Sequence, residues 1–311
     1  MVVADAFGAH VPVFRELTTS AQERAWLARL PDLVTELERR WGIATGSPYR
    51  TGVAAWTAPA ITDDDTLAVL KVSWPHREAR GEAEGLRFWA GDGVVRVLHS
   101  DDEHYALLLE RCAPGQALGE AAGSAEQRLA TAARLLRRLW SRQPAGGLAL
   151  ERVGDVTAEW AELVRERYRR LGQSLDGGMV ALGTELLVSL PATATREVVV
   201  HGDFNPGNVL SARRQPWLAI DPKPMIGDPA YDPWAMLTQM GSPFDDADPA
   251  GVLAARYRLF ADLVGEPVER LLAWSVARAV ESALWALDRG HPDAAHGQMA
   301  EAGLLAGIAG L

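Results

Sequence analysis

Hydrophobic positions in the first third of the chain follow two different periods. Between residues 20 and 41 they recur every three or four positions, which predicts an amphipathic helix that Pro31 kinks or splits. Short apolar runs predict four strands, at residues 53–57, 67–73, 94–99 and 105–111. A charged helical stretch at about residues 76–90 lies between the second and the third of these strands. We therefore expect a small sheet with one inserted helix.

The pattern changes after Pro114-Gly115, which interrupts the chain directly beyond the fourth predicted strand. Longer stretches with apolar residues on one face predict helices at about residues 125–140, 160–171, 182–190, 249–264 and 267–289. The Ala/Gly-rich segment from Ala294 onward is weakly patterned, so we expect its end to be frayed. Two domains are expected: residues 1–112 with the sheet, and residues 113–311 with most of the helices.

A polar run between residues 201 and 228 carries the candidate chemistry. Asn208 opens the stretch Asn-Val-Leu-Ser, Asp221 closes the stretch that begins Trp-Leu-Ala-Ile, and the polar turn Arg-Arg-Gln-Pro joins the two. Strands joined in this way form an antiparallel hairpin, so Asn208 and Asp221 are predicted to project from neighbouring positions. Asp203 lies on the loop just before them. Two oxygen ligands for a divalent cation, with a carboxylate alongside, are what phosphoryl transfer from Mg-ATP requires.

Composition narrows the class of protein. The 311 residues carry 31 Lys and Arg against 41 Asp and Glu, a formal charge of −10, which disfavours nucleic-acid binding. The excess acid either keeps the protein soluble or marks an acidic cleft for a polycationic substrate. A single cysteine, Cys112, excludes an internal disulfide. No apolar run reaches the roughly 18 residues that span a membrane, and the N-terminus lacks a basic signal segment, so we expect a cytoplasmic protein.

The tripeptide His-Gly-Asp at 201–203, followed by Asn208 and Asp221, resembles the catalytic loop and metal-binding segment of the protein-kinase-like fold, in its aminoglycoside phosphotransferase branch. Three segments resemble more narrowly the streptomycin 6-phosphotransferase and hydroxyurea phosphotransferase family: residues 67–93, 105–115 and 217–234. The resemblance runs over most of the chain and is weak in residues 141–196. It implies an α+β bilobal fold, with a small antiparallel sheet lobe that has an inserted helix and a larger helical lobe that carries the catalytic loop and the metal-binding hairpin.

The resemblance implies a role for each residue of this loop. Asp203 would be the catalytic base that orients the acceptor hydroxyl, and Asn208 and Asp221 would bind Mg²⁺. His201 fills the place of a structural histidine that is hydrogen-bonded to the backbone. Gly202 stands where protein kinases have an arginine, so a phosphorylated activation loop would find no charge partner there. We therefore expect constitutive activity.

A lysine of the sheet lobe is expected to bind the phosphates of ATP. Lys71 lies among apolar residues of a predicted strand, where a lysine needs a charged partner. A carboxylate on the following helix would supply that partner. Glu82 is the favoured residue, and Glu78, on the same face of the predicted helix, is the alternative.

Two further segments of this lobe are expected to contact the nucleotide. Gly52, in the run Thr51–Ala55, would let the backbone approach the phosphates closely. Residues 109–113 are expected to be the hinge whose backbone binds adenine, and they include Glu110 and Cys112. The side chain of Cys112 is expected to pack rather than to react.

The helical lobe is expected to bind the acceptor. Asp228 and Asp232 are expected to be buried supports, and Lys223 to contact either phosphate or an acidic neighbour. The candidates for binding a cationic acceptor are carboxylates and tryptophans: Glu281, Asp288, the acidic loop 245–248, Trp234, Trp274 and Trp285.

Together these features predict an ATP-dependent O-phosphotransferase for a small hydroxylated, cationic molecule, with streptomycin as the favoured acceptor. Hydroxyurea, a sugar or another metabolite is the alternative within the same chemistry. A pseudokinase scaffold would lack at least one of the catalytic residues, and a metal-dependent hydrolase built on His201, Asp203 and Asp221 would need further ligands nearby. We expect ATP and Mg²⁺ as cofactors, a small molecule as partner, and no nucleic acid, membrane or obligate protein partner.

Overall fold

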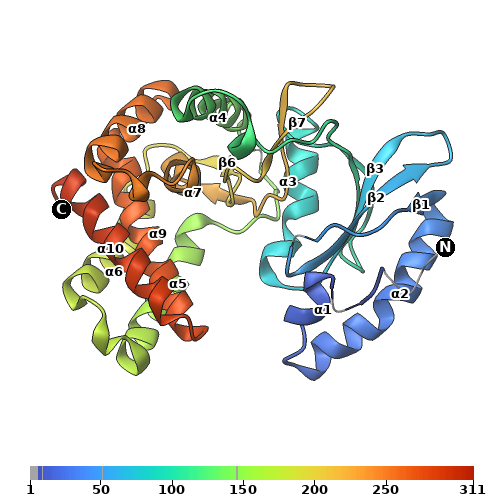
Figure 1. Ribbon diagram of the computed structural model, residues 1–311, viewed down its shortest axis with the longest axis horizontal. Helices are drawn as coiled ribbons and strands as arrows, with labels where there is room; N and C mark the ends of the chain where they lie inside the picture. The colour runs from blue at the N-terminus through green and yellow to red at the C-terminus, as the bar shows by residue number, and fades with distance from the viewer. Residues whose placement is uncertain (1–5, 9, 51, 145) are drawn as a thin grey trace. The chain divides into compact units, whose positions relative to one another are not determined.

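The computed structural model describes residues 6–8, 10–50, 52–144 and 146–311 (Figure 1). The chain divides into two compact units, Met1–Gly115 and Gln116–Leu311. Within the described residues, no helix has the length and hydropathy that a membrane span needs.

The first unit is built on a five-stranded antiparallel sheet with the strand order β1-β2-β3-β5-β4. Its strands are β1 (Ile43–Thr45), β2 (Ala55–Thr62), β3 (Leu67–Ser73), β4 (Val97–Asp101) and β5 (Ala106–Glu110). The sequence predicted the last four of these, although β2 and β4 both begin and end later than expected. It missed β1, because three residues are too few to show an alternating pattern.

The helices of this unit are α1 (Pro12–Glu16), α2 (Ala21–Trp41) and α3 (Glu82–Trp89). Leu30 and Leu37 of α2 belong to the same buried core as Leu70 of β3, so α2 covers that face of the sheet. Successive side chains of a strand point to opposite faces. Lys71 therefore points to the other face, toward Glu82 of α3.

Helix α2 is continuous through Pro31, so of the two expected effects of this proline, a kink or a split, the split does not occur. Both ends of the helix are capped. Ser20 and Glu23 form a reciprocal capping box, and Gly42 closes the other end in the left-handed conformation with φ 59°. These caps and the buried apolar face outweigh the single hydrogen bond that a proline removes.

The predicted helix at residues 76–90 is divided into two parts. Arg77–Arg80 forms a 3₁₀ turn, and α3 begins only at Glu82. Glu78 and Glu82 therefore do not share the face of one α-helix, as the sequence had suggested.

The second unit is mainly helical and is arranged around α9 (Val268–Asp288), whose residues are largely buried. The other helices are α4 (Ala125–Trp140), α5 (Val153–Leu171), α6 (Gly177–Ala192), α7 (Pro233–Gln239), α8 (Pro249–Val264) and α10 (Pro292–Ala309). Helices α5, α6, α7, α8 and α10 all contact α9. Among these helices, α4 contacts β6 (Val198–Val200) and α5 contacts β9 (Met225–Gly227), so these short strands pack against the helical part of this unit.

The segment that was expected to fray is the regular helix α10. Its buried residues include Ala295, Ala302 and Ala306, and it packs along α9 (Figure 1). Small residues let two helix backbones approach closely, but they give little contrast between an apolar and a polar face. The expectation was wrong because this helix is stabilised by its neighbour and not by an amphipathic pattern of its own.

Two small antiparallel sheets interrupt the helices of the second unit. β6 (Val198–Val200) pairs with β9 (Met225–Gly227), and β7 (Val209–Ser211) pairs with β8 (Trp217–Ala219). The second pair is the hairpin that the sequence predicted. The loop between β6 and β7 carries Asp203, and the loop between β8 and β9 carries Asp221.

Candidate active site

The loop that the sequence predicts to be catalytic begins where the buried strand β6 ends. His201 follows directly, and its ring is fully buried. Its Nδ1 accepts a hydrogen bond from the backbone N–H of Asp203 (3.3 Å), so the proton lies on Nε2, which donates to the carbonyl of Ile220 (3.1 Å). Burial lowers the pKa of His201 to about 4, and the ring is neutral at pH 7. The predicted hydrogen bonding of His201 to the backbone is confirmed.

The buried carboxylate of Asp232 holds this loop in place. One oxygen accepts from the backbone N–H of His201 (2.9 Å) and from the indole N–H of Trp140 (3.0 Å), and the other accepts from the N–H of Gly202 (2.8 Å). Burial raises the pKa of Asp232 to about 6, although the three N–H donors favour its ionised form. Asp232 is the buried support that the sequence predicted.

Gly202 is required by the close approach of another segment. It has φ +81°, and a Cβ atom placed there would lie 2.0 Å from the carbonyl oxygen of Lys223. The N–H of Lys223 also donates to the carbonyl of His201 (2.7 Å). The side chain of an arginine would not fit at position 202. Steric exclusion therefore explains why a glycine stands here in place of the arginine of protein kinases.

Three side chains fix the carboxylate of Asp203. Asn205 Nδ2 donates to Oδ1 (3.0 Å), while Asn208 Nδ2 (3.1 Å) and Lys223 Nζ (2.7 Å) contact Oδ2. Asn205 also accepts from the backbone N–H of Gly207 (2.9 Å), which shapes the turn. Asn205 was not among the site residues predicted from the sequence. Its position two residues after Asp203, just before Pro-Gly, was the available signal of a turn.

The hairpin of β7 and β8 brings Asn208 next to Asp221. Val209 pairs with Ala219, and the N–H of Ile220 donates to the carbonyl of Asn208 (2.9 Å), so Asp221 comes one residue beyond the partner of Asn208. Asp221 has φ 54°, the left-handed conformation, which turns the chain sharply after the hairpin. The hairpin geometry inferred from the sequence is confirmed.

The donor set at this hairpin fits a magnesium ion that is shared with a nucleotide. The Nδ2 of Asn208 donates to Asp203, which directs the amide oxygen of Asn208 elsewhere. In the part of the chain that the structure describes, no cluster of three or more His, Cys, Asp or Glu side chains could hold a metal ion. Mg²⁺ commonly binds through one or two protein oxygens and completes its shell with phosphates and water. Asn208 and Asp221 match that requirement.

An ion pair in the first unit joins β3 to α3. Lys71 Nζ lies 2.6 and 2.7 Å from the two carboxylate oxygens of Glu82, and the two side chains are only 11% and 5% exposed. Of the two carboxylates proposed from the sequence, Glu82 makes this pair. The carboxylate of Glu78 is half exposed and lies 3.9 Å from His76 Nε2.

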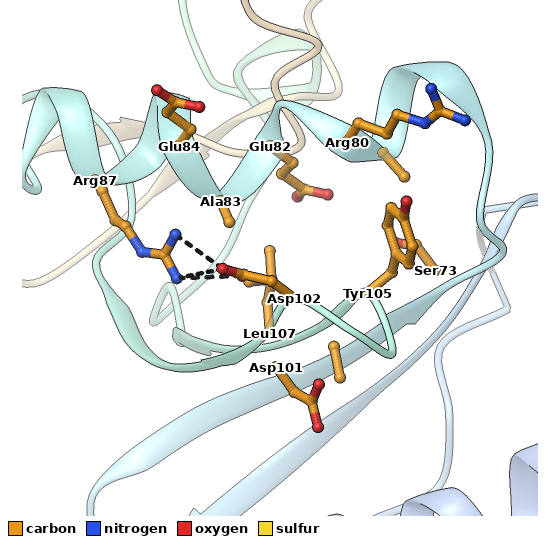
Figure 2. A pocket seen from close by; sticks show the side chains of 12 residues that line it. Ser73, Arg80, Glu82, Ala83, Glu84, Arg87, Asp101, Asp102, Tyr105 and Leu107 are labelled. Carbon is orange, nitrogen blue, oxygen red and sulfur yellow. Dashed lines mark hydrogen bonds and ion pairs between the residues drawn. The ribbon is translucent and has the colours of Figure 1, made fainter. Parts of the chain in front are cut away.

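A cavity of about 180 Å³ lies beside α3 in the same unit. Its wall includes Glu82, Tyr105 and Asp101. Figure 2 shows the carboxylate of Glu82 turned toward the loop that carries Tyr105, with Arg87 and Asp102 joined across the space by hydrogen bonds. Glu82 therefore belongs both to the ion pair and to the wall of the cavity.

The remaining residues proposed for nucleotide binding lie on loops and at a strand end. Gly52 lies before β2 with φ +85°, a conformation that favours glycine, whereas Thr51 lies outside the described residues. Glu110 ends β5, and its carboxylate accepts from the backbone N–H of Arg96 (3.1 Å). Cys112 follows in the connecting segment and is buried.

Trp274 is not an acceptor-binding surface. It is fully buried, and its indole N–H donates to Asp228 (2.6 Å). Asp228 also accepts from Arg270 (2.7 Å) and from the backbone of Ala230 (3.0 Å), and it is buried as predicted. A solvent-facing role for Trp274 was a wrong expectation, because the sequence shows an aromatic residue on a helix but not the neighbours that cover it.

Two carboxylates proposed for a cationic acceptor already have cationic neighbours. Arg167 lies 3.6 Å from Glu281 and 3.2 Å from Asp288, and Arg170 contacts Asp288 at 2.5 Å. Trp234 faces the guanidinium of Arg278 at 5.1 Å. These contacts reduce the electrostatic attraction that Glu281 and Asp288 could offer to a cationic ligand.

The chain matches known proteins over most of its length. The model of a family described as aminoglycoside/hydroxyurea antibiotic resistance kinase matches residues 40–290. The chain is 34% identical over 274 residues to a streptomycin 6-kinase of Streptomyces glaucescens, which covers 86% of each chain. It is 35% identical over 294 residues to a hydroxyurea phosphotransferase of Kitasatospora aureofaciens, which covers 93% of this chain and 83% of the relative.

The fold is also found in solved structures. A choline kinase of Streptococcus pneumoniae matches with a TM-score of 0.61 at 12% identity, over 90% of this chain and 99% of the other. At this identity the match concerns the fold alone. Together with the small antiparallel sheet and the helical second unit, it confirms the α+β, protein-kinase-like fold that the sequence resembles.

Proposed function

Because the chain belongs to the aminoglycoside/hydroxyurea antibiotic resistance kinase family, we propose that it transfers the γ-phosphoryl group of ATP to a hydroxyl of a small cationic molecule. Streptomycin is the favoured acceptor, since a relative 34% identical to this chain is a streptomycin 6-kinase. The observation that carries the proposal is the carboxylate of Asp203, which three side chains fix beside the hairpin of Asn208 and Asp221.

Asp203 is proposed to orient the acceptor hydroxyl. The hydroxyl donates its hydrogen bond to the carboxylate of Asp203, and its oxygen attacks the γ-phosphorus. The bond from that phosphorus to the β–γ bridging oxygen breaks, ADP leaves with the electron pair, and the hydroxyl proton passes to Asp203 and then to water. The hydrogen bonds to Asp203 support this role because positioning contributes much of the catalysis in phosphoryl transfer.

Asn208 and Asp221 are proposed to hold Mg²⁺, which would neutralise phosphate charge when it is bound. An amide and a carboxylate together give one formal negative charge, so the ion can still be shared with phosphate oxygens. Lys223 is two residues beyond Asp221, and its backbone N–H donates to the carbonyl of His201. This hydrogen bond ties the segment of Asp221 to the loop that carries Asp203.

Lys71 is proposed to contact the phosphates of ATP, with Glu82 holding its ammonium group in place. The two short contacts in a nearly solvent-free environment support this assignment. Gly52 is proposed to let the backbone approach the phosphates. The backbone at Glu110 and Cys112 is proposed to bind adenine, because Glu110 ends β5 and Cys112 follows it in the connecting segment. Because ATP is the donor, we propose that the enzyme acts in the cytoplasm.

Hydroxyurea is the second candidate acceptor. The hydroxyurea phosphotransferase of Kitasatospora aureofaciens is 35% identical to this chain over 294 residues, which is as similar as the streptomycin 6-kinase is. The charge of the chain, −10, favours the cationic acceptor, because long-range attraction raises the local concentration of a cation near an acidic protein.

A screen for ADP release tests the proposal. Wild-type enzyme and the Asp203→Ala variant would be supplied with Mg-ATP and with streptomycin, hydroxyurea, other aminoglycosides or sugars. We expect streptomycin to stimulate ADP release by the wild type, and Asp203→Ala to lose more than about a thousandfold of kcat with little change in ATP affinity. The exposed residue Asp262 offers a control, Asp262→Ala, that should remain active. If no acceptor stimulates the wild type, the proposed function is wrong.

A further inference from the structure

The segment that follows the proposed metal ligand sends a lysine back to the catalytic loop. Lys223 Nζ lies 2.7 Å from Asp203 Oδ2, and the two side chains are 28% and 30% exposed. We propose that Lys223 is a positioning residue, which holds the carboxylate of Asp203 in its reactive orientation and offsets its charge. This inference rests on the proposed function, in which Asp203 orients the acceptor hydroxyl.

The backbone determines where Lys223 lies. Its N–H donates to the carbonyl of His201 (2.7 Å), and its carbonyl oxygen lies where a side chain of residue 202 would begin. The left-handed turn at Asp221 directs the chain into this position. The ammonium group therefore starts from a backbone that is locked to the same loop as its partner. Such an ion pair loses less conformational entropy on forming than one between two mobile surface side chains.

The hydrogen bonds of Asp203 are shared among three donors. Asn205 binds Oδ1, and Asn208 and Lys223 bind Oδ2. A carboxylate offers about four acceptor sites, so the acceptor hydroxyl takes the fourth. The two asparagines alone would leave the charge of the carboxylate unbalanced. Lys223 is the charged member of the set.

That charge has a specific task in phosphoryl transfer. An anionic carboxylate that orients the attacking hydroxyl must stand close to a γ-phosphoryl group that is itself negative, and like charges at short range repel. The ammonium of Lys223 offsets the charge of Asp203 on the side of Oδ2. In the reaction the hydroxyl proton moves to Asp203, whereas the protons of Lys223 stay where they are.

A lysine at this position could instead bind the nucleotide directly, and the kinetic parameters separate the two roles. Through Asp203, Lys223 affects the transition state and leaves nucleotide affinity unchanged. As a phosphate ligand, it contributes to the binding of ATP and ADP. The first role lowers kcat at constant KM for ATP, and the second raises KM for ATP and the Kd of ADP.

The experiment compares Lys223→Met with Lys223→Arg and with the control Arg213→Met, which removes an exposed cation from the turn between β7 and β8. We expect Lys223→Met to lower kcat about 10- to 100-fold, with KM for ATP and the Kd of ADP within about twofold of the wild type. Lys223→Arg should recover part of the loss, and Arg213→Met should behave as the wild type.

A double-mutant cycle shows whether Lys223 acts through Asp203. In the background of Asp203→Ala, the further change Lys223→Met should have little effect on the residual kcat, because the carboxylate that it positions is already gone. An equal loss in both backgrounds, or a raised KM for ATP, overturns the inference. If the wild type is active and Lys223→Met has the same kcat, the inference about Lys223 is also wrong, but the proposed function stands. Absence of turnover by the wild type with every acceptor overturns the proposed function, and the inference with it.

Discussion

Asp232 reaches back 30 residues along the chain to hold Gly202, whose N–H lies 2.8 Å from its Oδ1. The same carboxylate binds the N–H of His201, so it fixes two successive peptide groups directly before Asp203. The buried carboxylate thus orients the proposed catalytic residue without contacting its side chain.

Replacing the carboxylate of Asp232 tests this support. In Asp232→Asn, the amide oxygen could still accept two of the N–H groups, but the amide nitrogen would face the third donor. We expect the free energy of unfolding to fall by about 1–3 kcal/mol, the cost of a buried donor without a partner, and kcat to fall with it. Urea unfolding and steady-state kinetics would measure both. The exposed Asp262→Asn should change neither, and an unchanged kcat in Asp232→Asn would contradict the role of this residue.

A methyl group at position 202 should be far more costly than one at another glycine of the same conformation. Gly202 has φ +81° and Gly290 has φ +79°. A Cβ at position 202 would meet the carbonyl of Lys223, whereas a Cβ at position 290 would have no atom within 4 Å apart from its chain neighbours. Gly290→Ala should lower the free energy of unfolding by about 1 kcal/mol through backbone strain alone. Gly202→Ala should cost about 3 kcal/mol more and abolish turnover. Equal losses in chemical denaturation would show that Lys223 can move away.

His201 should make stability depend on pH. Its pKa is lowered from 6.5 to about 4 by burial, so between these values the unfolded chain binds more protons than the folded protein. The contribution of His201 to the free energy of unfolding therefore rises with pH across this window and is lost as the pH falls toward 4.

Asp232 opposes this trend, because its pKa is raised from 3.8 to about 6 and the folded protein holds the extra proton in that window. Asp232 is present in both the wild type and the variant His201→Asn, so comparing the two isolates the effect of His201. The loss of unfolding free energy caused by His201→Asn should be larger at pH 6 than at pH 4. Denaturant unfolding at several pH values measures the difference. The exposed His291→Asn is the control, and parallel pH profiles for wild type and His201→Asn would refute the prediction.

The ion pair of Lys71 and Glu82 should matter both for stability and for ATP. In Glu82→Ala the nearly buried ammonium of Lys71 loses the carboxylate of Glu82, and we expect a loss of about 3 kcal/mol in the free energy of unfolding. KM for ATP should rise, since Lys71 is no longer held in place. Glu78→Ala is a matched control, because Glu78 is half exposed and should contribute less than about 1 kcal/mol. A larger effect of Glu78→Ala would reverse the assignment.

Asp221 should determine how strongly magnesium promotes nucleotide binding. Asp221→Asn suits the test better than alanine, because asparagine tolerates the left-handed φ of 54° at this position. We expect the affinity for ATP to become much less dependent on Mg²⁺, while the affinity measured with a chelator stays the same. Calorimetric titrations with and without Mg²⁺ would show this. An unchanged magnesium dependence would remove Asp221 from the proposed metal site.

The sequence by itself determined the local parts of the site. Strand period, a polar turn and the positions of Asn208 and Asp221 were enough to predict the hairpin of β7 and β8, because residues joined by a short turn must pair with each other. The ion pair of Lys71 and Glu82 was predicted through the family resemblance, because the local pattern alone left Glu78 open and placed both glutamates on one helix face.

The tertiary structure decided which distant groups meet. The contacts of Asp232 with Gly202 and with Trp140, and the burial of Trp274 against Asp228, depend on how helices pack, which local periodicity does not record. The order of α10 likewise depends on α9. A repeating pattern specifies which side of an element is apolar. Which buried polar atom finds which partner is decided only when the elements pack together, because each such atom needs a hydrogen bond wherever it is enclosed.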